Sequence, residues 1–227
     1  MSEIAAVILA AGQGTRMKSS LPKVLHPVGG LAMILWSVRR ATELGADPIV
    51  LVVGKGAEAV RETVGEGVLY AFQAERLGTG HATLQARELL QSRAEAVLVL
   101  YGDMPLLRLD TLRRLVSLHR ERKPAITLLS VESDDSMGFG RIVRDKDGDV
   151  TAIVEEAVAT ADVLAIKELN CGVYCFDAEW LWQHLPDVPV TQPKGECYLT
   201  DTVGLAVAGG KRVELLTITD VTEVQGD

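Results

Sequence analysis

The distribution of apolar residues along the chain predicts an α/β fold. Short apolar runs alternate with segments in which apolar residues recur every three or four positions, the spacing typical of amphipathic helices. Ala96–Tyr101 is almost entirely apolar, as expected for a central parallel strand buried on both faces. The other strands expected in the first 131 residues are Ile4–Leu9, Ile49–Val53, Leu69–Phe72 and Ala125–Val131, and the helices are Met33–Leu44, Ala57–Val64, His81–Leu90 and Leu109–Glu121. This order predicts a mostly parallel, Rossmann-like central sheet with helices on both faces.

The second half of the chain has a different pattern. Asp147-Gly148 separates two short strand-like runs, which is typical of a β-hairpin. We interpret this half as an antiparallel insertion against the sheet, so residues 1–227 are expected to form one domain with a poorly ordered polar tail, 220–227. The strands expected here are Gly140–Arg144, Asp149–Val154, Leu169–Phe176 and Lys211–Ile218, and the helices are Glu179–His184 and Leu199–Ala208.

Charge along the chain points to one site for an anion. The net charge of −8 argues against a nucleic-acid surface. Between Glu3 and Glu43, however, there is no acidic residue, and five cations fall in that span. Positive potential is therefore concentrated in one part of an acidic protein. A solvated basic helix face is the alternative for Arg39 and Arg40.

The remaining composition is that of a globular cytoplasmic protein. The apolar runs are too short for a transmembrane helix, and the N-terminus lacks the layout of a signal peptide. The three cysteines are an odd number and make no disulfide framework, so we expect buried, reduced thiols.

The glycine-rich loop in residues 7–25 is the strongest candidate for ligand binding. Gly12 and Gly14 let the backbone approach a ligand, so that several N–H groups can converge on one anion. Arg16, Lys18 and Lys23 follow and could neutralise a polyphosphate. The loop lacks the third glycine of a dinucleotide fingerprint and the Gly-Lys-Ser/Thr of a P-loop. On the glycines alone, a structural turn is an equally good interpretation.

Ligands of open α/β sheets lie beyond the carboxyl ends of the parallel strands, which adds two segments to this loop. Asp103 follows the central strand and could hold a divalent cation, or cap the next helix. Gln73 follows another strand, and its amide matches the hydrogen-bonding edge of uracil. Thr79 is expected to be a helix N-cap, and His81 is better interpreted as a packing residue than as an acid or base.

The motifs together resemble a known family. Leu9-Ala10-Ala11-Gly12-Gln13-Gly14-Thr15-Arg16-Met17 followed by Leu21-Pro22-Lys23 is similar to the signature of sugar-1-phosphate nucleotidylyltransferases. The segment 73–82, the Gly-Asp-Met-Pro at 102–105 and the Gly-Glu-Cys-Tyr-Leu-Thr-Asp at 195–201 extend the resemblance over nearly the whole chain. They resemble the uridylyltransferase half of the bifunctional bacterial N-acetylglucosamine-1-phosphate uridylyltransferase/glucosamine-1-phosphate acetyltransferase.

The resemblance implies roles for individual residues. It implies catalytic roles for Arg16, Lys23 and Asp103, with Asp103 also holding Mg²⁺. The implied nucleotide-binding residues are Leu9, Ala10, Ala11, Gly12, Lys23, Gln73, Gly78, Thr79, Tyr101 and Gly102. The implied sugar-binding residues are Asp103, Gly140, Glu155 and Asn170.

The activity implied is transfer of a uridylyl group from UTP to N-acetylglucosamine 1-phosphate, with UDP-N-acetylglucosamine and pyrophosphate as products and Mg²⁺ as cofactor. Two alternatives stay open: another sugar 1-phosphate or nucleotide with the same chemistry, and a nucleotide-sugar-binding module without turnover. No nucleic acid or membrane partner is expected.

The sequence departs from the family pattern in three places. Leu31-Ala32 stands where Lys-Pro is usual, and Ala157-Val158 replaces a lysine and an aspartate. The family's second Mg²⁺ ligand, an asparagine, follows a motif that here ends the chain at Gly226-Asp227. We therefore expect a single nucleotidylyltransferase domain, 1–227, without the family's left-handed β-helix acetyltransferase domain, and a monomer, because that β-helix builds the family's trimer.

Overall fold

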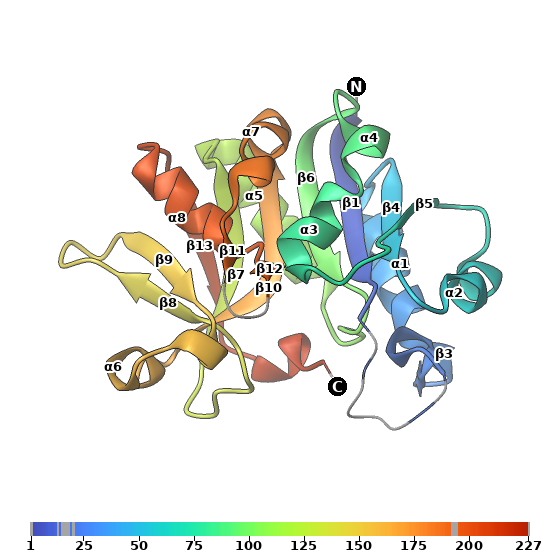
Figure 1. Cartoon of the computed structure of the whole chain (residues 1–227), viewed down its shortest axis with the longest axis horizontal. Coiled ribbons are helices and arrows are strands. Elements are labelled where there is room, and N and C mark those ends of the chain that lie inside the picture. The colour runs from blue at the N-terminus through green and yellow to red at the C-terminus, as the bar shows by residue number, and fades with distance from the viewer. Residues whose placement is uncertain (1, 13, 15–18, 20, 192–194, 227) are drawn as a thin grey trace.

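The computed structural model describes residues 2–12, 14, 19, 21–191 and 195–226. Its centre is a nine-stranded sheet whose main path runs in the order β13, β7, β10, β6, β1, β4, β5 (Figure 1). These strands are β13 (Val213–Ile218), β7 (Ile126–Glu132), β10 (Glu168–Asp177), β6 (Ala94–Tyr101), β1 (Ser2–Ala10), β4 (Ile49–Val53) and β5 (Leu69–Phe72). Only β10 runs antiparallel to its neighbours on this path. The mostly parallel α/β fold expected from the sequence is thus confirmed.

Helices cover both faces of the sheet because the central strands are apolar on both sides. In β1, Ile4, Ala6 and Ile8 join one hydrophobic layer, whereas Ala5, Val7 and Leu9 join the other. The first layer packs against α1 (Met33–Leu44), α2 (Ala57–Val64) and α5 (Leu109–Arg122). The second packs against α3 (Gly78–Leu84), α4 (Arg87–Leu90), α7 (Ala178–His184) and α8 (Asp201–Ala208).

The predicted hairpin is present, and it pairs with a strand that lies inside the central sheet. β8 (Arg141–Arg144) and β9 (Val150–Val154) flank Asp147-Gly148, and β8 pairs with β10 at Leu169. Part of the expected antiparallel insertion is therefore in the central sheet itself, because β10 lies between β6 and β7, whereas β8 and β9 lie off its main path. The alternation of apolar residues could not reveal this, since a strand buried on both faces reads the same in either direction.

Two local expectations were wrong. The helix expected at His81–Leu90 begins earlier and is divided into α3 and α4. Gln85 and Ala86 between them donate to carbonyls three residues back, at 3.1 Å each, a tighter turn than an α-helix makes. The polar tail is also structured: the 3₁₀ helix η5 (Val221–Val224) buries Glu223 and Val224.

Short elements complete the described chain. They are η2 (Lys23–Leu25), the ribbon of β2 (Pro27–Val28) and β3 (Leu31–Ala32), η3 (Glu156–Val158), α6 (Ala161–Leu164), η4 (Leu185–Asp187), and the ribbon of β11 (Val190–Thr191) and β12 (Glu196–Cys197). The three cysteines are free, and Cys171 and Cys175 are buried, as expected. Within the described ranges, no helix has the length and apolar character needed to cross a bilayer.

Stability should depend on pH through His119 of α5. His119 is buried, and its Nδ1 lies 2.9 Å from Thr127 Oγ1 of β7. Burial lowers the pKa of His119 to about 4 from an ordinary 6.5. Between these values the unfolded chain binds a proton that the folded chain does not, so the free energy of unfolding falls as the pH falls.

We expect His119→Gln to remove this dependence while keeping a partner for Thr127. Urea unfolding at pH 7 and pH 5 should show that the wild type loses about 2 kcal/mol more than the variant over that interval. Equal losses in the two proteins would mean that His119 is not the titrating group.

Candidate active site

A cavity of about 670 Å³ opens at the carboxyl ends of the parallel strands. Its lining comes from the end of β1 and the segment that follows, from the segments after β5 and β6, from α3 and from 196–198. The lining residues are Leu9, Ala10, Ala11, Gly12, Gly14, Lys23, Val24, Gln73, Arg76, Gly78, Thr79, Ala82, Tyr101, Asp103, Glu196 and Tyr198. Nine of the ten residues expected to bind nucleotide therefore line it, and the tenth, Gly102, comes directly before Asp103, which also lines it.

Lys23 and Asp103 form the charged centre of the site. Lys23 Nζ lies 2.7 Å from Asp103 Oδ2, and both side chains are largely shielded from solvent. The segment that carries Asp103 leaves the sheet beside β1, since Gly102 N–H donates to Leu9 O of β1 at 2.9 Å. An ammonium group has three donors, so Lys23 can keep this contact and still bind an anion.

Two glycines at the site are required by close packing. Gly14 has a φ of +56°, and a Cβ there would lie 2.5 Å from Cβ of Lys23. Gly102 has Ile34 Cδ1 2.6 Å from where its Cβ would be, so it allows α1 to pack against the end of β6. The first glycine leaves room for Lys23, and the second leaves room for Ile34.

The amide of Gln73 has a defined orientation. Gln73 is buried, and its Nε2 donates to Gly78 O at 3.2 Å and lies 3.0 Å from His81 Nδ1. In the His81 tautomer that carries its proton on Nε2, both amide hydrogens are thereby directed at protein atoms. The amide oxygen is consequently what Gln73 can offer to a ligand, as an acceptor. His81 contributes to this arrangement from the first turns of α3, in addition to its packing.

Thr79 does not cap α3, contrary to expectation. The N-cap is Leu77, with no side-chain hydrogen bond, and Thr79 Oγ1 instead accepts from Leu199 N–H at 2.9 Å. Cys197 N–H also donates to Leu77 O at 2.7 Å. The segment 195–200 is therefore bound along α3, which brings Glu196 and Tyr198 to the first cavity. Its hydrogen bond with Glu196 raises the pKa of Tyr198 to about 12, so the phenol stays protonated.

A second cavity, of about 320 Å³, adjoins the first. It shares Lys23, Tyr101 and Asp103 with the first cavity, and these residues form the junction between the two. Its other lining residues are Met104, Met137, Gly138, Phe139, Gly140, Glu155, Asn170, Cys171, Gly172, Val224 and Gly226. Together with Asp103 at the junction, these include all four residues expected to bind sugar.

The polar residues of the second cavity are held by specific bonds. Asn170 Nδ2 donates to the buried Tyr174 hydroxyl at 2.6 Å, and Asn170 N–H donates to Gly140 O at 2.9 Å. Glu155 Oε1 accepts from Thr200 Oγ1 at 2.7 Å. These bonds orient an amide and a carboxylate that both line the cavity, and such groups suit recognition of hydroxyl groups on a sugar-like compound.

Tyr101 separates the two cavities as a neutral phenol. Burial, together with the Glu155 and Asp103 carboxylates, raises the pKa of Tyr101 above its ordinary value. Its ring packs on Gly172, where φ is +75° and a Cβ would lie 2.5 Å from Tyr101 Cε2. Any larger residue at this position would push the ring out of the junction.

Asp103 fits the expected role in holding a divalent cation. In the described part of the chain no three His, Cys, Asp or Glu residues gather as a metal cluster. Mg²⁺, however, commonly takes one or two carboxylates and completes its shell with phosphate oxygens and water. Asp103 presents a carboxylate at the junction of the two cavities, where phosphate groups from either side could reach it.

Some outcomes differ from the sequence-based expectations. Arg16 lies outside the described residues. Arg76, Glu196 and Tyr198 line the first cavity and were not expected to. For Glu196 and Tyr198 the signal was the 195–201 motif, but its distance of 120 positions from Thr79 could be bridged only by folding.

The chain is similar to known proteins along its whole length. The family model for the MobA-like NTP transferase domain matches residues 6–166. The bifunctional protein GlmU of Syntrophotalea carbinolica is 46% identical over 225 residues, covering 99% of this chain and 48% of that protein. The protein of the same name from Brevibacillus brevis is 46% identical over 226 residues, covering 100% of this chain and 49% of that protein. The chain thus spans about half the length of these relatives.

A solved structure is similar in fold. It is a Bacillus anthracis protein that carries the name glucose-1-phosphate thymidylyltransferase, in complex with sucrose. The TM-score is 0.76 at 19% identity, over 95% of this chain and 87% of that one. At this level of identity the similarity extends to the fold alone.

The contact between α3 and the segment 195–200 can be tested at Gly78. Its φ is +95°, and a Cβ would lie 2.4 Å from Cys197 O. We expect Gly78→Ala to lower the free energy of unfolding by about 1–3 kcal/mol, from backbone strain and a displaced segment.

Gly204→Ala is the matched control. Gly204 is inside α8, and a Cβ there would meet nothing within 4 Å. The same substitution should raise the free energy of unfolding by about 0.5–1 kcal/mol. Urea denaturation of both variants measures the difference, and a neutral Gly78→Ala would contradict the described packing.

Proposed function

We propose that this chain, which belongs to the MobA-like NTP transferase family, transfers a uridylyl group from UTP to N-acetylglucosamine 1-phosphate. The observation that carries the proposal is the junction of two cavities at Lys23, Asp103 and Tyr101. A group-transfer enzyme needs a donor site and an acceptor site whose phosphates meet at a charged centre. The names and identities of the GlmU relatives support the choice of substrates.

In the proposed reaction, a phosphate oxygen of N-acetylglucosamine 1-phosphate forms a bond to the α-phosphorus of UTP. The bond between the α-phosphorus and the bridging oxygen breaks, and pyrophosphate leaves with that electron pair. The attacking phosphate is already an anion, so no protein nucleophile or base is required. Catalysis then consists of orienting the two phosphates and stabilising the charge between them.

Lys23 is proposed to stabilise that charge. Its Nζ is at the junction, and its contact with Asp103 fixes its direction before substrate binds. The N–H groups of the loop after β1 would receive the UTP phosphates, together with Arg16, whose role follows from the sequence alone. A divalent cation bound to Asp103, Mg²⁺ in this proposal, would supply further positive charge to the phosphate oxygens of both substrates.

The first cavity is proposed to read the base through Gln73. With His81 protonated on Nε2, both amide hydrogens are directed at Gly78 O and His81, and the amide oxygen is available to accept a hydrogen bond. Uracil carries a hydrogen on N3 and can donate to it, whereas cytosine has only a lone pair there. The same oxygen therefore favours UTP and disfavours CTP.

The second cavity is proposed to hold the sugar. Glu155 and Asn170 would accept from and donate to its hydroxyl and N-acetyl groups, with Gly140 beside them. The reaction is proposed to occur in the cytoplasm, whose reducing conditions suit three free cysteines. We propose that the chain acts as a monomer on these small molecules, without nucleic acid.

The reaction class is tested by pyrophosphate release from UTP, N-acetylglucosamine 1-phosphate and Mg²⁺. Turnover with these substrates, above that with CTP, GTP, dTTP or glucose 1-phosphate, supports the proposal. Turnover with a different nucleotide or sugar 1-phosphate would mean that the reaction class is right and the proposed substrates are wrong. Calorimetric binding of UDP-N-acetylglucosamine without any turnover would favour a binding module instead.

Charge at the junction should be essential for turnover. We expect Lys23→Ala and Asp103→Ala each to lower kcat about 100-fold or more, the size of effect seen when a preorganised charge partner is lost. Lys167→Ala removes an exposed cation whose partner is Asp134 and should leave kcat unchanged. Wild-type rates in either junction variant would rule out this mechanism.

Base selection should depend on Gln73. We expect Gln73→Leu to lower kcat/KM for UTP about tenfold, the value of one hydrogen bond in a closed site, and to affect CTP much less. Gln85→Leu is the control, because Gln85 also contacts His81 but does not line the cavity. Parallel losses for UTP and CTP in Gln73→Leu would show that Gln73 does not read the base.

A further inference from the structure

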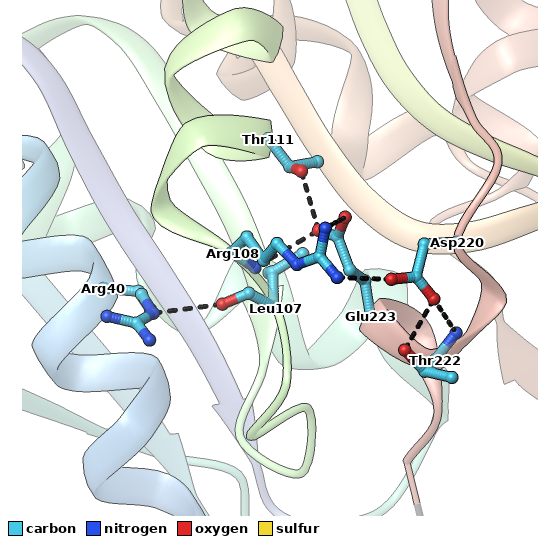
Figure 2. Close-up of polar contacts among 7 residues, drawn as sticks. All are labelled: Arg40, Leu107, Arg108, Thr111, Asp220, Thr222 and Glu223. Carbon is cyan, nitrogen blue, oxygen red and sulfur yellow. Dashed lines mark hydrogen bonds and ion pairs between the residues drawn. The ribbon is translucent and has the colours of Figure 1, made fainter.

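The C-terminal segment is tied to the loop that follows Asp103 by a buried carboxylate. Glu223 of η5 is only 4% exposed. Its Oε2 accepts from Thr111 Oγ1 at 2.7 Å and from Arg108 N–H at 3.3 Å (Figure 2). These partners are more than 110 positions away in sequence, and they are the N-cap residue and a first-turn residue of α5.

Glu223 supplies a hydrogen-bond acceptor that the residues next to the N-terminus of α5 do not. Arg108 is the N-cap residue of α5, and its side chain makes no capping hydrogen bond. The first N–H groups of a helix need acceptors, and a negative charge there is favoured by the helix dipole. A carboxylate from the end of the chain therefore completes the start of α5.

Ion pairs that are partly exposed to solvent surround the hydrogen bonds of Glu223. The Arg108 guanidinium pairs with Asp220 and has its Nη1 3.6 Å from Glu223 Oε1. Because the Arg108 side chain is 59% exposed, solvent screens these pairs, and the buried bonds of Glu223 carry more of the attachment. On the other side of the loop, Arg40 Nε of α1 donates to Leu107 O at 3.1 Å (Figure 2).

The attached segment forms part of the second cavity. Val224 and Gly226 line that cavity, and Val224 is buried in the core. A Cβ on Gly226 would lie 3.0 Å from Asp103 O and 3.5 Å from its Cγ. The end of the described chain thus packs directly against the residue at the junction of the two cavities.

We propose that Glu223 is a positioning residue for the second cavity. Its bonds to the first turn of α5 hold Val224–Gly226 against Asp103 and so determine the shape of that wall. Glu223 itself touches neither cavity. Its effect on the sugar 1-phosphate rests on the proposed function, whereas its effect on the Asp103 loop does not.

Removal of the carboxylate should weaken binding of one substrate only. Among the described residues, none from 220–226 lines the first cavity. We expect Glu223→Ala to raise KM for N-acetylglucosamine 1-phosphate at least fivefold while KM for UTP stays within twofold. Glu223→Gln keeps an acceptor for Thr111 and should restore most of the difference. A purely structural loss would instead lower the active fraction, and hence kcat, without separating the two KM values.

Asp177→Ala is the matched control. Asp177 also caps a helix with its carboxylate, accepting from Trp180 N–H of α7 at 2.8 Å. It pairs with Ala96 at the start of β6, the end of the sheet opposite Asp103. This variant should lose comparable stability and keep both KM values. Unchanged KM values in Glu223→Ala, or equal changes in Glu223→Ala and Asp177→Ala, would overturn the proposal.

Amide hydrogen exchange tests the attachment made by Glu223 independently of the proposed function. In the ligand-free protein, Glu223→Ala should increase amide exchange in 103–108, and Asp177→Ala should not. If the wild type showed no turnover, the proposed function would fail, and the exchange result alone would decide the attachment. Unchanged exchange in 103–108 would then disprove the role of Glu223.

Discussion

The pairing of β1 with β6 in the middle of the sheet determines where the site can lie. Their register places Leu9 beside Tyr101, and the next residue, Gly102, donates to Leu9 O. Two chain segments that are 90 residues apart therefore leave the sheet side by side. Both strands are almost wholly buried, so their register is set by packing on two faces. Lys23 and Asp103 lie on the two segments that follow these strands, and they meet at 2.7 Å.

Charge at the junction follows from the same geometry. The protein is acidic as a whole, but the segment that follows β1 lies within the acid-free stretch between Glu3 and Glu43 and brings Lys23 to Asp103. An ion pair largely shielded from solvent orients both side chains before any ligand binds. Tyr101 stays neutral beside it because burial and two nearby carboxylates oppose its ionisation. The junction thus combines one cation, one anion and one neutral donor.

Segments from the second half of the chain complete the site from two directions. The segment 195–200 packs on α3, where Gly78 and Gly80 leave room for Cys197. The segment 220–226 packs on the loop after Asp103, through Glu223. Neither has a long helix or strand of its own, so each is stabilised mainly by its tertiary contacts. The first cavity depends on the former and the second cavity on the latter.

By itself, the sequence determined the fold class, most element boundaries and the residues gathered at the carboxyl ends of the strands. The spacing of apolar residues is a local property from which strands and helices can be predicted. Because ligands of open α/β sheets lie beyond the carboxyl ends of the parallel strands, the predicted strands also indicate where the site lies. Only the tertiary structure decided the position of β10 inside the sheet, the role of Thr79 as an acceptor for Leu199 and the order of the tail around Glu223. Each of these depends on contacts between residues far apart in sequence. The free energy of such contacts cannot be inferred from a local sequence pattern.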